Sequence, residues 1–185
     1  MTDDLSDFLD GLAPGAEDHT EWPGGLSFQV TSYLTDREPP HKLVTSARAI
    51  VMRGTEIMVV RDPTSLHIRP GGRIEEGETW EEAMRREVLE ETGWTVSRAK
   101  LLGFTLSRHL QPKPEGYVYA YPHFLHALYA AVADSFRPEG KEVDGHELEA
   151  ALRPQKDVEA LALTQGERLF LRAALDWRNT PSLSY

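Results

Sequence analysis

The sequence predicts an α/β protein in which helices pack on a mixed central sheet. Segments with the hydrophobic period of strands alternate with segments that have the period of helices, but without the regular rhythm of repeated βαβ units. The chain has 185 residues, of which 40% are hydrophobic and 27% are charged. These values are ordinary for one globular domain with a sizeable core.

Residues 1–40 differ in composition from the rest, since they are rich in acidic residues, glycine and proline and end at Pro39-Pro40. We expect an N-terminal arm that is partly disordered or loosely docked, followed by a domain over residues 41–185. Within the arm, residues 26–34 alternate well enough to form an added strand. This strand would pair with the domain or with a second subunit, so a homodimer is one arrangement that the sequence allows.

The elements of the domain follow from hydrophobic period and turn residues. Strands are expected at residues 43–52, 56–60, 65–69, 95–106 and 117–133, and helices at residues 80–92 and 164–177. The first two of these strands are joined by a turn at Gly54, and the third ends at Pro70-Gly71-Gly72.

Composition and charge exclude several classes of function. No stretch approaches the roughly 18–20 apolar residues that a membrane span needs, and the acidic N-terminus is unlike a secretory signal, so we expect a cytoplasmic protein. The absence of cysteine excludes thiolate nucleophiles and Cys-type zinc sites. The net charge of −10, with scattered Lys and Arg, argues against docking on nucleic acid. Because this charge repels an anionic substrate, a phosphate substrate would need a metal ion nearby.

The helix at residues 80–92 carries clear end signals. Thr79 and Glu82 form a Thr-x-x-Glu capping box, and Gly93 is a natural C-terminal stop. At about 100° per residue, three apolar side chains four residues apart make a stripe for the core: Trp80, Met84 and Val88.

Beside this stripe, Glu87, Glu90 and Glu91 fall within an arc of roughly 100°. Like charges at this spacing repel by a few tenths of a kcal/mol, and each acid in the last turn opposes the helix dipole at about 0.3–1 kcal/mol. A divalent cation would reverse both effects, and hard oxygen ligands favour Mg²⁺ or Mn²⁺. The alternative is an exposed acidic helix face with Arg85 and Arg86 as solvated partners.

The residues around this helix resemble the signature of the Nudix hydrolases. That signature is Gly, five residues, Glu, seven residues, Arg-Glu, an apolar residue, any residue, Glu-Glu, any residue, Gly and an apolar residue. The chain matches every fixed position from Gly72 through Glu78 to the run REVLEETGW at residues 86–94. The resemblance implies a Nudix-type α/β/α sandwich with a mixed central sheet, over roughly residues 43–178.

The resemblance also implies roles for individual residues. The glutamates that match Glu87, Glu90 and Glu91 coordinate divalent ions in the family, and a backbone carbonyl of the glycine turn, here Gly72, often joins them. The glutamate that matches Glu78 usually pairs with the arginine that matches Arg86, and this pair supports the site.

The implied reaction is the metal-dependent hydrolysis of a diphosphate bond in a nucleoside diphosphate linked to another moiety, a small-molecule substrate. With Mg²⁺ or Mn²⁺ to neutralise phosphates and acidify water, a carboxylate removes the proton from the attacking water. We expect Glu90 and Glu91 to be catalytic, with Glu90 as the base. Some relatives draw the base from a later loop, which here offers Glu139, Glu142, Asp144 and Glu147.

Substrate contacts are expected at Arg69, Arg108 and Tyr117. Arg69 stands just before the Pro-Gly-Gly turn, where relatives carry an apolar residue, and would either reach solvent or contact the substrate. The basic run at residues 108–113 and the tyrosines near Tyr117 would either line a nucleotide pocket or pack on a neighbouring strand. His123 and His126 are three apart, which places them on opposite faces of a strand and argues against a shared metal.

Two other functions compete with hydrolysis. A catalytically silent Nudix-fold module would bind nucleotides or regulate a partner, but such a module would be free to lose its repulsive acids. An isomerase of the same fold that acts on isopentenyl diphosphate relies on a cysteine, which this chain lacks.

Overall fold

The computed structural model describes residues 3–22, 25–63, 65–113, 115–117, 120–141 and 149–180. In chain order the elements, with two short 3-10 helices labelled η, are α1 (Asp3–Leu9), β1 (Ala16–Trp22), β2 (Leu26–Leu34), η1 (His41–Leu43), β3 (Val44–Arg53), β4 (Glu56–Arg61), β5 (Leu66–His67), β6 (Gly71–Arg73), α2 (Trp80–Thr92), β7 (Trp94–His109), β8 (His123–Phe136), η2 (Pro138–Gly140), β9 (Glu149–Pro154), α3 (Gln155–Glu159) and α4 (Gln165–Asn179).

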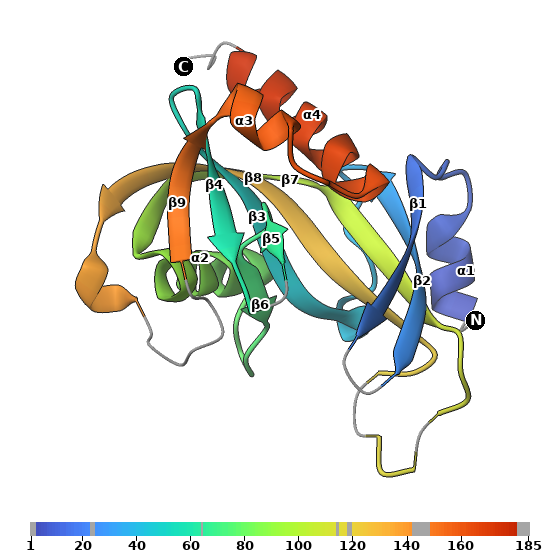
Figure 1. Cartoon of the computed structure of the whole chain (residues 1–185). Coiled ribbons are helices and arrows are strands. Elements are labelled where there is room, and N and C mark those ends of the chain that lie inside the picture. Colours follow the sequence, from blue (N-terminus) through green and yellow to red (C-terminus); the bar gives the residue numbers. More distant parts are fainter. Residues whose placement is uncertain are drawn as a thin grey trace.

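The described strands form one curled sheet in the order β1-β2-β7-β8-β3-β4-β5, with β6 beside β3 and β9 beside β4 (Figure 1). The pairing of β3 with β8 is parallel and the other pairings are antiparallel. The mixed sheet that the sequence predicts is therefore confirmed.

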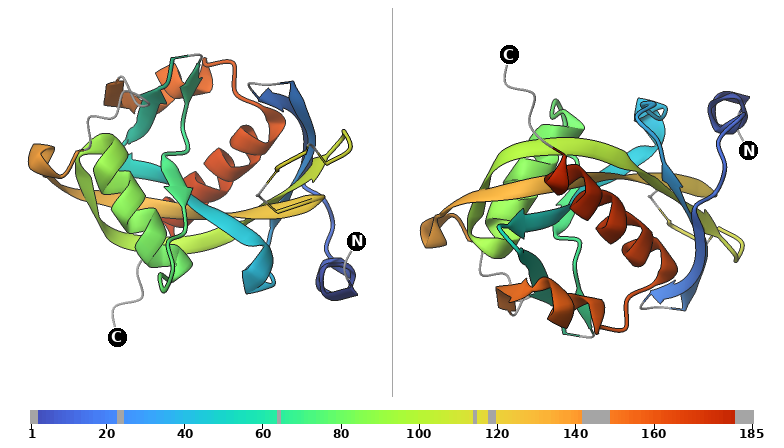
Figure 2. Two further views of the ribbon diagram at one scale, coloured as in Figure 1. Left: turned by 90° about the horizontal axis from the view of Figure 1, so that it is seen from below. Right: turned by 90° about the horizontal axis from the view of Figure 1, so that it is seen from above.

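Helices cover both faces of this sheet, with α2 on one side and α4 on the other (Figure 2). Strand β3 shows why, because its apolar side chains alternate between the two faces. Ala47, Ala49 and Val51 belong to the core cluster that includes the apolar stripe of α2. Ile50 and Met52 belong to the second cluster, with the apolar side chains of α4. This is the α/β/α arrangement expected from the sequence.

The helix expected at residues 80–92 is observed as α2, and the last helix runs over Gln165–Asn179 instead of residues 164–177. The strand expected to start at Tyr117 is wrong at its start, since β8 begins at His123. Pro122 has no N–H to donate to a strand ladder, so regular pairing begins after it. Helices α1 and α3 and strands β1, β6 and β9 were not expected, and the strand expected at residues 65–69 is shorter, over Leu66–His67.

The N-terminal residues are part of the sheet. Strand β2 pairs with β7 over seven residue pairs, and β1 pairs with β2 over another seven. Helix α1 buries Leu5 and Phe8 in the core, where the Phe8 ring lies 5.1 Å from that of Phe104. The domain boundary at residue 40 and the homodimer stay predictions.

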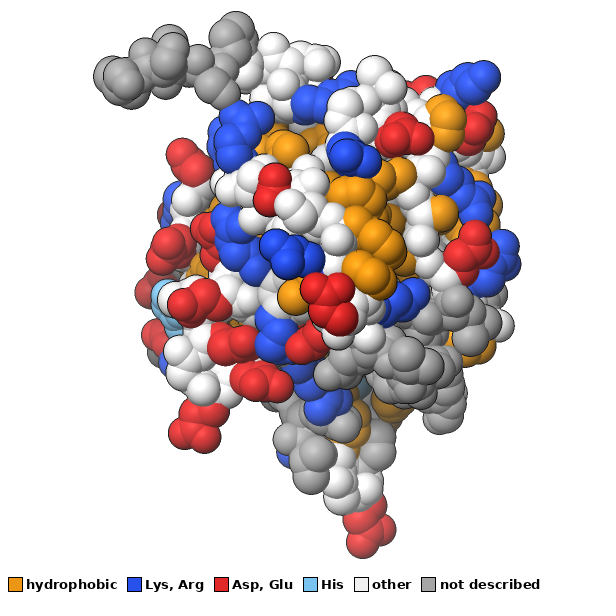
Figure 3. Space-filling model, turned by 90° about the vertical axis from the view of Figure 1, so that its left-hand side faces the viewer, with side chains coloured by type: hydrophobic (Ala, Val, Ile, Leu, Met, Phe, Trp, Pro, Cys, Tyr) orange, Lys and Arg blue, Asp and Glu red, His pale blue; other side chains and the backbone are white. Residues whose placement is uncertain are grey.

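Charges on the surface are mixed near α2. The left-hand side of Figure 1, where α2 lies, faces the viewer in Figure 3, and Asp and Glu side chains gather there with Lys and Arg among them. The acids of this face therefore have basic neighbours. Among the described helices, none is long and apolar enough to cross a membrane.

Candidate active site

Helix α2 holds the candidate glutamates, and its two ends form as the sequence predicts. The Thr79 hydroxyl accepts from the Glu82 N–H at 3.2 Å, while the Glu82 carboxylate accepts from the Thr79 N–H at 2.9 Å. Gly93 ends the helix with a φ of 75°, a left-handed conformation that glycine adopts without a steric penalty. These local contacts fix where the last turn, with its three glutamates, lies.

The glycine turn of β6 lies directly against two of these glutamates. The Gly71 N–H donates to Glu91 Oε2 at 3.0 Å. A Cβ atom at Gly72 would lie 2.3 Å from Glu87 Oε2, closer than real side chains come. Only glycine at position 72 therefore lets the backbone approach the Glu87 carboxylate.

Arg86 connects the acids of the site. Its guanidinium makes a bidentate contact with Glu78, at 2.7 Å from Nε and 2.9 Å from Nη2. Its Nη1 also donates to Glu87 at 3.0 Å and to Glu90 at 2.9 Å. One planar guanidinium thus orients three carboxylates, as arginine geometry allows. The Glu78–Arg86 pair was expected to support the site. The bidentate contact would do so by fixing the position of the Arg86 guanidinium.

Burial and charge affect the acids of the site differently. The hydrogen bond from Arg86 lowers the pKa of Glu78. Burial raises the pKa of Glu87, although its hydrogen bond with Arg86 acts in the opposite direction. The Glu87 side chain is only 16% exposed. A half-buried carboxylate whose charge is incompletely compensated is a group that a cation would stabilise.

The oxygen atoms of the three glutamates and the glycine turn are the kind that binds a divalent cation. In this structure the carboxylates have protein groups as partners. Among the described residues, no three or more His, Asp or Glu side chains converge on one point. Glu91 instead accepts from Gly71, and Glu87 and Glu90 accept from Arg86. Three carboxylates on one helix face beside a glycine backbone are nevertheless the oxygen donors that Mg²⁺ and Mn²⁺ take.

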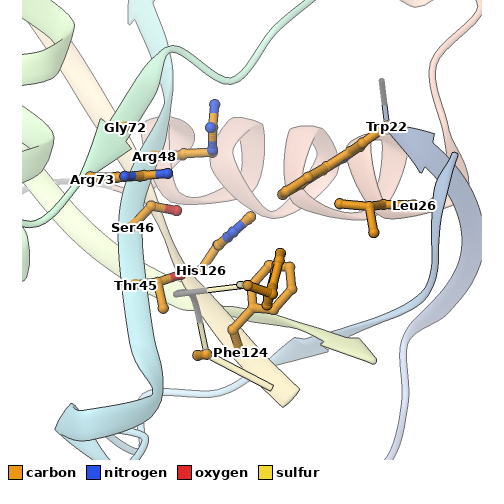
Figure 4. Close-up of a pocket in the computed structure, with 11 residues that line it drawn as sticks. Trp22, Leu26, Thr45, Ser46, Arg48, Gly72, Arg73, Phe124 and His126 are labelled. Carbon is orange, nitrogen blue, oxygen red and sulfur yellow. The ribbon is translucent and has the colours of Figure 1, made fainter. Parts of the chain in front are cut away.

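A pocket of about 270 Å³ opens beside this turn (Figure 4). It is lined by Trp22, Leu26, Thr45, Ser46, Arg48, Gly72, Arg73, Tyr117, Ala120, Phe124 and His126. Gly72 contributes to the pocket wall and also borders the Glu87 carboxylate. The pocket and the glutamate cluster are therefore parts of one site.

The three expected substrate contacts have different positions. Tyr117 lines the pocket, and its hydroxyl lies 3.1 Å from His109 Nε2. Arg69 lines a neighbouring pocket that shares Trp22 and His126 with this one, and its Nε lies 3.4 Å from the buried Glu167 of α4. Arg108 is exposed and donates to Gln29 on the neighbouring strand at 2.6 Å. Neither arginine is among the described residues that line this pocket, so their substrate contacts stay predictions.

The later loop contributes one described acid. Glu139 lies in η2, whose Gly140 packs against Leu89 of α2. Leu89 is about 200° around the helix from Glu87, so η2 contacts the far side of α2 from the glutamate cluster. The other candidate bases of this loop, Glu142, Asp144 and Glu147, lie outside the described residues.

The sequence reasoning missed several residues of the pocket. Arg48 and Ser46 stand two apart in β3, on a face of the strand that is otherwise apolar, and this polar pair was a usable signal. Trp22 and Leu26 belong to the hairpin of β1 and β2, and nothing in the local sequence indicates that this hairpin reaches the glycine turn.

Comparison with known proteins agrees with this fold. The family model described as the NUDIX domain matches residues 42–174. The solved structure of a mutant of the Bacillus subtilis pyrophosphohydrolase BsRppH is similar at a TM-score of 0.58 and 16% identity, covering 90% of this chain and 99% of that one. A NUDIX hydrolase from Nitrosomonas europaea is similar at a TM-score of 0.50 and 22% identity, covering 77% of this chain and 97% of that one. At these identities the likeness to solved structures concerns the fold.

Proposed function

Because this chain belongs to the NUDIX family and is a Nudix hydrolase, we propose that it cleaves the diphosphate bond of a nucleoside diphosphate linked to another moiety. One observation carries this proposal. Gly72 lies against the Glu87 carboxylate on one side and lines a pocket with Arg48 and Arg73 on the other. Carboxylates for a cation and guanidinium groups for phosphates therefore meet at a single turn.

The residues that would hold Mg²⁺ or Mn²⁺ are Glu87, Glu90, Glu91 and the backbone of Gly72. When bound, such an ion neutralises phosphate charge and lowers the pKa of water. The contacts of Arg86 support this metal-binding role, since its guanidinium holds the Glu87 and Glu90 carboxylates on the same side of α2.

The chain's own side chains would carry the remaining tasks. Arg48 is half-buried in β3 and Arg73 is exposed at the end of β6, so both line the pocket from the side of the glycine turn. We propose that both arginines bind the phosphate groups of the substrate, because guanidinium groups match phosphate geometry. Glu90 would accept the proton of the attacking water, with Glu91 as the second catalytic carboxylate.

A hydrolysis screen tests this function. Phosphate or nucleotide release would be measured over nucleoside triphosphates, nucleotide sugars, dinucleoside polyphosphates and coenzyme A, with and without Mg²⁺ or Mn²⁺. We expect turnover only with metal, and a loss of about 100-fold or more in Glu87→Gln and Glu91→Gln. Glu81→Gln is the matched control, because Glu81 lies in the first turn of the same helix and pairs with Arg85.

The outcomes separate the competing functions. Full activity in Glu87→Gln and Glu91→Gln would show that the metal assignment is wrong. No turnover of any compound by the wild-type protein would favour the catalytically silent nucleotide-binding module.

A further inference from the structure

We propose that the β1–β2 hairpin is the specificity wall of the substrate pocket, with Trp22 stacking on a heteroaromatic ring of the nucleobase class. The hairpin precedes residues 42–174, which are the residues that match the family model. The inference rests on the proposed function for the identity of the site, and it adds which part of this chain selects the group attached to the diphosphate.

Trp22 is on the inward face of the hairpin but is not covered. Along β1, residues 16, 18 and 20 are partly buried and residues 17, 19 and 21 are exposed, so the alternation turns Trp22 inward. Trp22 is nevertheless 42% exposed to solvent. An inward-facing tryptophan that remains accessible has a ring face available to a ligand.

Two buried aromatic rings, those of Phe28 and Phe124, neighbour Trp22. Its ring centroid lies 4.6 Å from that of Phe28 and 5.9 Å from that of Phe124. Leu26, the cross-strand partner of Trp22 in the last pair of the hairpin, lines the same pocket. The indole therefore packs against buried rings and is still partly exposed.

The hairpin is anchored at both ends, so this wall is in place before a ligand arrives. The Asp18 carboxylate accepts from the N–H groups of Gln165 and Gly166 at the start of α4, at 2.9 and 2.8 Å. At the other end, Gln111 accepts from the Ser27 N–H at 2.9 Å and donates to the Ser27 hydroxyl at 2.7 Å. Anchoring of this kind lowers the entropy lost on binding.

The two ends of the pocket differ in chemistry, one being basic and the other apolar. In Figure 4, Arg48 and Arg73 lie with Gly72 at one end, Trp22 and Leu26 lie at the other, and His126 is between them. Burial, together with Arg48 and Arg69, holds the pKa of His126 well below its ordinary value, so the middle of the pocket is uncharged near neutral pH. A ligand with phosphates at the arginine end would therefore place its uncharged portion against Trp22.

The chemistry of the far end favours a ring over an aliphatic chain. Besides Trp22 at this end, Tyr117 and Phe124 also line the pocket, and aromatic side chains offer π faces to a flat group. The volume of about 270 Å³ is just below the range of about 300–1,000 Å³ usual for ligand pockets. There is room for one ring system with its attachments, so a second nucleoside would lie outside.

Binding of nucleoside monophosphates tests this inference independently of turnover, since they contain no phosphate–phosphate bond. Isothermal titration calorimetry with Mg²⁺ would compare AMP, GMP, CMP and UMP with inorganic phosphate and a prenyl monophosphate. The variants are Trp22→Ala, Trp22→Leu and Trp22→Phe, with Glu21→Ala as control because Glu21 is exposed on the same strand.

We expect Trp22→Ala to weaken the best-bound nucleotide by about 5- to 150-fold, the usual effect of losing one base–aromatic stack. Trp22→Phe should keep most of the affinity, Trp22→Leu should lose it, and phosphate binding should not change. The inference is overturned if Trp22→Ala binds nucleotides as tightly as Glu21→Ala, if Trp22→Leu matches Trp22→Phe, if the prenyl compound binds best, or if no nucleotide binds. Failure of the proposed function is a separate result, seen in the hydrolysis screen as no turnover by the wild-type protein or as full activity in Glu87→Gln and Glu91→Gln.

Discussion

The glutamate cluster of α2, which adjoins the pocket through Gly72, and the β1–β2 hairpin, which lines it, are assembled in different ways. In the cluster, Arg86 contacts a glutamate 8 residues away, and Gly71 contacts one 20 residues away. In the hairpin, Ser27 is held by a residue 84 positions along the chain, and Asp18 contacts one 148 positions away.

This difference indicates that the catalytic part of the site depends on contacts between residues close in the sequence. The part that selects the substrate depends on contacts between residues far apart in the sequence. The cluster is one helix and one turn, so its geometry depends mainly on caps and neighbouring side chains. The hairpin depends on how β1, β2 and α4 come together, and each such contact closes a long loop of chain. Changes in the cluster should therefore affect catalysis, whereas changes at the hairpin anchors should affect local stability and affinity.

The largest effect is expected at the glycine turn. Gly72→Ala would place a Cβ 2.3 Å from Glu87 Oε2, so the turn or the carboxylate must move. A displacement of about 1 Å can cost about 100-fold in rate, and we expect a loss of that size in metal-dependent hydrolysis per folded protein.

Gly54→Ala is the control for this change. Gly54 has a positive φ, unlike Gly72, but a Cβ atom at position 54 would meet no atom within 4 Å. It should strain the backbone and leave hydrolysis intact. Equal losses of rate in both variants would show that the close approach at position 72 has no catalytic role.

A smaller effect, on stability, is expected at Arg86. Arg86→Met leaves the carboxylates of Glu78, Glu87 and Glu90 without their shared guanidinium. We expect the free energy of unfolding in urea, measured with EDTA, to fall by about 2–3 kcal/mol. Arg85→Met removes a surface pair with Glu81 and should cost about 0.5 kcal/mol. Added Mg²⁺ should restore part of the loss in Arg86→Met, and identical urea midpoints for the two variants would contradict this account.

The smallest effect is expected at the hairpin anchor. Asp18→Ala removes the acceptor for two N–H groups at the start of α4, which should cost about 1 kcal/mol, as the loss of a helix cap does. Hydrogen exchange should accelerate in β1 and β2 but not in α2, and nucleotide affinity should fall with little change in kcat. Glu21→Ala should change none of these quantities. Faster exchange in α2 would show that the hairpin and the cluster are one cooperative unit.

Much of the fold could be predicted because its signals are periodic. The apolar run of β3 and the apolar stripe and caps of α2 are visible in the sequence, and the structure confirms both elements. Strand β9 was missed because its residues, Glu149–Pro154, lack strict alternation and form a strand by pairing with β4. The start of β8 was misplaced because the tyrosines before it mimic strand alternation.

By itself, the sequence determined the helix of the glutamates, its caps, and the glycine and arginine beside them, because those contacts span at most 20 residues. Only the tertiary structure decided that Arg69 lies by Glu167, that Arg48 faces the glycine turn and that Trp22 closes the pocket. Such contacts join strands and helices far apart in the chain. Their partners are chosen by sheet order and layer packing, which leave no periodic trace in the local sequence.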